Sequence, residues 1–148
     1  MRNLLLPPIV LLISAAAMVL LHRAWPLATL LAPPWNAAGV PLVVAGLAVA
    51  QWHARLFRRV GTEINTFRRP GRLVREGLFR VSRNPMYLGF AIALAGVALG
   101  LGSASPWLAW LLFILLTDRW YIRVEEAAML ACFGDEYAAY QREVRRWL

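Results

Sequence analysis

The chain has 148 residues, of which 60% are hydrophobic and 16% are charged. This length suits one compact unit. A soluble domain of this size cannot bury so much apolar surface, so we expect lipid to cover part of it. The single cysteine, Cys132, excludes an internal disulfide, and with only two isolated histidines no metal site is predicted.

The net charge is +8, and every one of the 16 basic residues is an arginine. The arginines lie between apolar runs, which fits membrane orientation and anionic lipid better than nucleic acid. No nucleic-acid partner is therefore expected.

Four apolar segments predict an all-α, integral membrane bundle that forms a single domain over residues 1–148. The predicted spans are residues 4–21, 37–52, 85–101 and 105–117. The first resembles a signal peptide at its start, but its apolar run continues to Leu21, a length typical of a retained helix. The fourth is expected to continue beyond the membrane as a cytoplasmic C-terminal helix.

The arginines also predict the topology. They gather in the loop of residues 53–84 and in the tail of residues 118–148, whereas the first loop holds only Arg23 and the third, residues 102–106, holds none. The positive-inside rule places the arginine-rich segments in the cytoplasm, together with both termini. We expect an integral protein of a bacterial inner membrane.

A first polar cluster leads into the third span. Asn84 before Pro85 is typical of an N-cap followed by proline at the first helical position. The helix would then begin at the cytoplasmic surface with free backbone N–H groups and its positive dipole end, where a carboxylate or phosphate can bind. Arg83 would add a full charge. The same residues are equally compatible with a cap that only anchors the helix.

A second cluster follows the fourth span. If the helix continues, Arg119, Arg123 and Glu126 share one face at i, i+4 and i+7, and Glu125 lies on the adjacent face. Adjacent carboxylates near arginines can bind both a diol and an anion. A solvated, salt-bridged helix face has the same pattern.

The third span carries Gly96 and Gly100 in GxxxG spacing. This spacing indicates close helix packing, inside the bundle or between two copies, and leaves the oligomeric state open.

Three ordered motifs carry a resemblance. Residues 83–89 (Arg-Asn-Pro-Met-Tyr-Leu-Gly), Glu125-Glu126 and residues 133–137 (Phe-Gly-Asp-Glu-Tyr) resemble the C-terminal half of isoprenylcysteine carboxyl methyltransferases. They are also similar to the broader membrane methyltransferase group that includes phospholipid N-methyltransferases. Upstream, Gly61-Thr62 with Asn65, and residues 71–74 before Gly77, resemble the loop that leads into this core. The likeness covers residues 61–148.

The resemblance implies methyl transfer from S-adenosyl-L-methionine to a lipophilic acceptor at the cytoplasmic membrane face. It implies cofactor contacts at Leu73, Val74, Phe79, Arg83, Asn84, Pro85, Met86, Tyr87, Glu125 and Glu126. It also implies an arginine that binds the acceptor, for which Arg123 is the first choice and Arg119 the second. Arg123 and Glu126 are then the expected catalytic pair.

One departure leaves the acceptor open. Asn84 stands where the prenylcysteine enzymes carry a histidine, and an amide cannot carry charge or act as a base. The alternatives are a prenylcysteine carboxylate, a phospholipid amine, a small thiol, or a non-catalytic membrane protein that retains the fold.

Overall fold

The computed structural model describes residues 6–60 and 73–148, and this part of the chain is all-α, as predicted, without a β-sheet. The α-helices are α1 (Pro7–Ala24), α2 (Gly39–Val60), α3 (Pro85–Leu101), α4 (Pro106–Leu116) and α5 (Ile122–Glu143). Two short 3₁₀ turns, η1 (Trp35–Ala38) and η2 (Gly77–Arg80), precede α2 and α3, and a π-helical turn, η3 (Thr117–Tyr121), joins α4 to α5.

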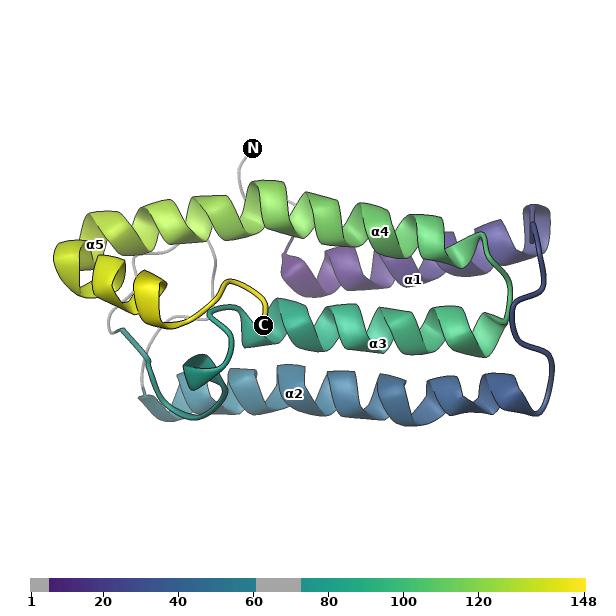
Figure 1. The fold of residues 1–148 in the computed structure, drawn as a ribbon, viewed down its shortest axis with the longest axis horizontal. Helices are drawn as coiled ribbons and strands as arrows, with labels where there is room; N and C mark the ends of the chain where they lie inside the picture. Colours follow the sequence, from purple (N-terminus) through teal and green to yellow (C-terminus); the bar gives the residue numbers. More distant parts are fainter. Residues whose placement is uncertain (1–5, 61–72) are drawn as a thin grey trace.

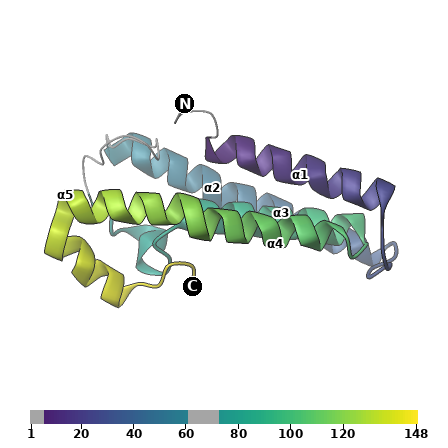
Figure 2. The same cartoon turned by 90° about the horizontal axis from the view of Figure 1, so that it is seen from above.

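Helix α3 is central, since it contacts α1, α2 and α4 (Figure 1). More than half of its residues are buried, from Pro85 to Ala98. Helix α4 continues through η3 into α5 as one long helix (Figure 2). The chain reverses direction at Gly134, which leaves helical geometry with φ 49° and ψ −125°. The C-terminal tail therefore returns to the beginning of α3.

The predicted spans match the helices with shifts at their ends. Residues 85–101 and α3 coincide, while α2 continues past residue 52 to Val60. Two helical stretches, Pro7–Ala24 and Trp35–Leu56, are long and apolar enough to cross a membrane, and α3 is a shorter apolar helix. Helix α4 has 11 residues and continues through η3 into α5.

Large apolar side chains point outward along three of the helices. The exposed residues include Leu12, Ile13 and Leu20 on α1, Val40, Val44 and Leu47 on α2, and Leu108, Leu111, Leu112 and Leu115 on α4. Apolar surface spread over this much of a small protein is typical of a lipid-covered exterior rather than a water-exposed one.

Helices α2 and α3 touch backbone to backbone through glycines. A Cβ atom on Gly89 would lie 2.6 Å from the carbonyl oxygen of Gly46, and one on Gly96 would lie 2.6 Å from that of Gly39. A Cβ on Gly100 would meet nothing within 4 Å. The prediction of close packing is thus confirmed for Gly96, and its partner is a helix of the same chain.

We predict opposite effects for the same substitution at these two glycines. Gly96→Ala forces α2 and α3 apart and should destabilise the bundle by roughly 1–3 kcal/mol. Gly100→Ala, on the same helix but facing open space, should be neutral or add roughly 0.5–1 kcal/mol. Thermal unfolding in detergent, followed by tryptophan fluorescence, measures both. Equal melting shifts for the two variants would contradict the packing.

Candidate functional site

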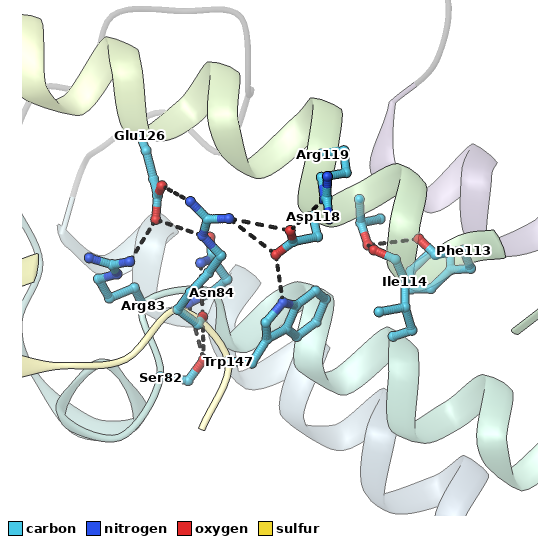
Figure 3. Close-up of polar contacts among 11 residues, drawn as sticks. Ser82, Arg83, Asn84, Phe113, Ile114, Asp118, Arg119, Glu126 and Trp147 are labelled. Atoms are coloured by element: carbon cyan, nitrogen blue, oxygen red, sulfur yellow. Dashed lines mark hydrogen bonds and ion pairs between the residues drawn. The ribbon is translucent and has the colours of Figure 1, made fainter. Parts of the chain in front are cut away.

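The start of α3 and the C-terminal tail meet at one end of the bundle (Figure 3). Asn84 occupies the N-cap position of α3 and Pro85 the first helical position, as predicted. The Asn84 side chain makes no capping hydrogen bond, however, and its Nδ2 donates to the backbone carbonyl of Arg146, at 3.0 Å. The first-turn N–H groups of α3 therefore have no cap from the Asn84 side chain.

Two contacts join the α3 motif to the carboxylates of α5. Arg83 Nη2 lies 2.9 Å from Glu126 Oε1, with exposed side-chain fractions of 10% and 11%. The Tyr87 hydroxyl donates to Glu125 Oε1 at 2.7 Å, and Tyr87 itself is buried. Four of the predicted site residues are thus in direct contact although about forty positions separate the two motifs.

Arg119 and Arg123 are both exposed, and among the described residues Arg119 forms an ion pair with its neighbour Asp118, at 3.7 Å. The expectation that Arg119 shares a face with Glu126 assumed a regular helix, but the π turn η3 lies between these two residues. Arg123 and Glu126 both belong to α5, three positions apart, so η3 does not affect their spacing. In η3 the Ile122 N–H bonds to the Thr117 carbonyl, five residues back. The extra residue in this turn rotates the preceding residues out of the α-helical phase.

The π turn instead brings Asp118 onto the side of Glu126. In a regular α-helix, residues eight positions apart lie about 80° out of line. One extra residue in the intervening turn nearly cancels this offset. Arg146 lies between these two carboxylates, and its guanidinium donates hydrogen bonds to both Asp118 and Glu126.

Asp118 is held ionised by these neighbours. Burial alone would raise the pKa of its carboxyl, but hydrogen bonds from Trp147 Nε1, at 2.9 Å, and from Arg146 outweigh burial and hold the pKa below its usual value. The guanidinium of Arg119 acts in the same direction. Asp118 is therefore a carboxylate at neutral pH.

Two tyrosines of α5 close the site on the side of η2. The Tyr140 hydroxyl donates to the carbonyl of Phe79 at 2.6 Å, and burial raises the pKa of Tyr140. Burial, with the nearby charge of Glu126, raises the pKa of Tyr137 to about 12. Both phenols therefore keep their protons at neutral pH.

The other residues predicted to contact the cofactor differ in how far they are buried. Val74, Phe79, Pro85 and Met86 are buried, whereas Leu73 is half-buried. Phe79 also packs edge-on against His53 of α2, with the ring centroids 5.4 Å apart. The upstream motif residues Gly61, Thr62, Asn65, Gly71 and Arg72 lie outside the described residues.

A separate pocket of about 370 Å³ lies along α2 and contains none of the predicted site residues among those described. Its described lining comprises Ala48, Gln51, Trp52, Arg55, Leu56 and Arg59.

Sequence reasoning missed the parts played by Asp118, Arg146 and Trp147. A faint signal existed: Asp118 is an acidic residue directly after an apolar span, and Arg146-Trp147 follows a helix that breaks at a glycine. Nothing in the spacing of these residues indicates that they meet.

Most of this chain is similar in sequence to a known protein family. Residues 35–136 match the phospholipid methyltransferase family, a region that includes α2, α3, α4, η3 and, in α5, Glu125 and Glu126. No solved structure matches the chain.

Two relatives cover shorter stretches. An uncharacterized protein of Haemophilus influenzae is 41% identical over 63 residues, which are 43% of this chain and 100% of that protein. The protein-S-isoprenylcysteine O-methyltransferase of Schizosaccharomyces pombe is 35% identical over 75 residues, which are 49% of this chain but only 30% of that enzyme. Because the family match spans most of the chain and contains the contacts between α3 and α5, the chain belongs to the phospholipid methyltransferase family.

Proposed function

We propose that this protein is an integral membrane methyltransferase that uses S-adenosylmethionine and acts on a lipophilic acceptor at the cytoplasmic membrane face. The main support is the direct contact between two motifs that are distant in the sequence: Arg83 pairs with Glu126, and Tyr87 bonds to Glu125. Use of S-adenosylmethionine by members of the family supports the choice of cofactor.

In the proposed topology α1, α2, α3 and α4 cross a bacterial inner membrane and α5 is cytoplasmic, as are both termini. The exposed apolar faces of α1, α2 and α4 support four spans. The arginines at the end of α2, Arg55 and Arg59, lie toward the same end of the bundle as the C-terminal tail (Figure 1), which supports a cytoplasmic site under the positive-inside rule.

The residues at this end fit the polar groups of the cofactor. Glu125 and Glu126 would accept hydrogen bonds from its hydroxyl or ammonium groups, and the uncapped first turn of α3 with Arg83 would hold its carboxylate. Arg83 Nε is buried and has no hydrogen-bond partner in the described part of the chain, so it is a donor available for that carboxylate. Apolar side chains at Leu73, Val74, Phe79, Pro85 and Met86 would border the cofactor, with Asn84 between them.

When bound, the cofactor supplies a methyl group on a sulfonium, which makes the departing thioether a good leaving group. The protein then needs no nucleophile of its own. Its residues have to hold donor and acceptor in line, which alone can supply roughly 7–11 kcal/mol. A site sheltered from water favours attack by an anion on a cation, because water stabilises the separated charges most.

The acceptor would reach the site laterally from the bilayer. Arg123, with Arg119 as the second choice, would orient an anionic group of the acceptor, and both are exposed for such an encounter. A phospholipid amine is the second candidate acceptor, because Arg83 and Arg146 already pair with carboxylates and a neutral amine needs no free guanidinium. A prenylcysteine carboxylate has the support of the Schizosaccharomyces pombe relative.

We predict that S-adenosylhomocysteine, the demethylated cofactor, stabilises the detergent-solubilised protein. Ligand at 100 times its dissociation constant should add about 2.7 kcal/mol. Glu125→Gln should weaken binding at least about tenfold, because hydrogen bonds to a charged group contribute about 1.5–3 kcal/mol. Glu136→Gln removes an exposed carboxylate of the same helix and should bind like wild type. Absence of any ligand-induced melting shift in the wild type would refute the proposed function.

A second prediction concerns the acceptor. Membranes that contain the protein should transfer label from methyl-labelled S-adenosylmethionine into the lipid fraction, or into prenylated peptide supplied in detergent. Arg123→Gln should lower this transfer while leaving the affinity for S-adenosylhomocysteine unchanged, and Arg142→Gln, another exposed arginine of α5, serves as the control. Equal transfer by Arg123→Gln and wild type would remove Arg123 from the acceptor site.

A further inference from the structure

We propose that Arg146, in the C-terminal tail, is a positioning residue that holds Asp118 and Glu126 in the orientation the methyl-transfer site requires. The proposal rests on the proposed function and adds to it a residue that neither binds the cofactor nor reacts. Its support lies in the contacts that Arg146 makes with three separate segments.

The guanidinium of Arg146 bridges two carboxylates. Its Nη1 lies 3.2 and 3.3 Å from the two carboxylate oxygens of Asp118. Its Nε lies 3.2 Å from Glu126 Oε1, and its Nη2 bonds to Glu126 Oε2. Both carboxylates are thus held through both of their oxygens, which fixes the planes of the two groups as well as their positions.

The backbone of the tail adds the third segment, the turn before α3. The Arg146 carbonyl accepts hydrogen bonds from Asn84 Nδ2, at 3.0 Å, and from Ser82 Oγ, at 3.4 Å, and the Arg145 carbonyl accepts one from the Arg83 N–H, at 3.0 Å. The neighbouring Trp147 packs against the apolar core and donates to Asp118. These hydrogen bonds place Arg146 between the turn before α3 and the two carboxylates.

No other arginine in the described part of the chain serves both carboxylates. Arg83 pairs with Glu126, and Arg119 approaches Asp118 at 3.7 Å. Because the π turn directs Asp118 and Glu126 to the same side, their like charges would repel each other without a cation between them. A lysine should replace this cation only in part, because its ammonium is a point charge and lacks the planar fork of donors that fixes the orientation of a carboxylate.

Two consequences for the site follow. Glu126 stays oriented toward Arg83, where the proposed cofactor site lies. The Asn84 amide is bonded to the tail backbone through Nδ2, and the Asn84 side chain does not cap the first-turn N–H groups of α3. Loss of the Arg146 side chain should therefore reduce cofactor affinity by releasing Glu126, although Arg146 does not touch the cofactor.

The test compares Arg146→Gln and Arg146→Lys with Arg145→Gln in the full-length, detergent-solubilised protein. Arg145 is the exposed neighbour and contributes only its backbone to the contacts above, so its substitution is a matched control. Titration calorimetry with S-adenosylhomocysteine, well below each melting temperature, reports the affinity of folded molecules. We expect at least tenfold weaker binding for Arg146→Gln, no full rescue by lysine, and wild-type binding for Arg145→Gln.

A double-mutant cycle separates positioning from a purely structural role. Asp118→Asn should also weaken binding, and combining it with Arg146→Gln should cost less than the sum of the two single effects. If Arg146→Gln does not fold, Arg146→Lys and Asp118→Asn carry the test. A lowered melting temperature with unchanged affinity would overturn the proposal, and so would tighter binding, which would make Arg146 a competitor of the cofactor. Failure of the wild type to bind would refute the proposed function itself.

Discussion

The buried ion pair between Arg83 and Glu126 joins the beginning of α3 to α5, and the rest of this end of the molecule is arranged around it. Two charged side chains that are about nine-tenths buried have lost most of their hydration, so each depends on the other and on further hydrogen bonds. Arg146 supplies those bonds to Glu126, and the Glu126 charge in turn acts on Tyr137. Removing Glu126 would leave the buried charge of Arg83 without its ion-pair partner, and breaking a buried pair in this way typically costs about 3–5 kcal/mol.

Packing among the apolar helices fixes the position of the start of α3, which carries the polar contacts. Glycines let α2 and α3 approach until their backbones touch, so α3 has little freedom to slide or tilt. The first turn of α3 and the residues before it therefore hold Arg83, Asn84 and Tyr87 in fixed positions. At the opposite end of α3, His22 Nδ1 of α1 lies 2.8 Å from Ser103 Oγ. Asn36 Nδ2 of η1 donates to the carbonyl of Gly100 at 3.0 Å, so α1 and η1 are both bonded to the C-terminal end of α3 or the turn after it.

The π turn η3 lies between the apolar helix α4 and the charged residues at the start of α5. A π turn is less favourable than an α turn, and such turns occur often at functional sites. Thr117 supports this one through hydroxyl bonds to the carbonyls of Phe113, at 2.8 Å, and Ile114, at 3.1 Å. The result is that Asp118 faces Arg146 and Trp147, while the neighbouring Arg119 is exposed. The extra residue in η3 therefore determines that Asp118 lies beside Arg146 and Glu126.

The sequence by itself determined the all-α class, the limits of α3 and the family. The limits of α3 follow from local chemistry, since Pro85 favours the first helical position and Gly102 adopts the left-handed conformation, φ 76°, that ends a helix. Only the tertiary structure decided which charges surround Glu126. A π turn has no periodic signature in the sequence, and a tail of five residues after α5 carries no pattern that predicts its return to α3. Both depend on long-range contacts with Asp118, Asn84 and Glu126, which exist only once the helices have packed.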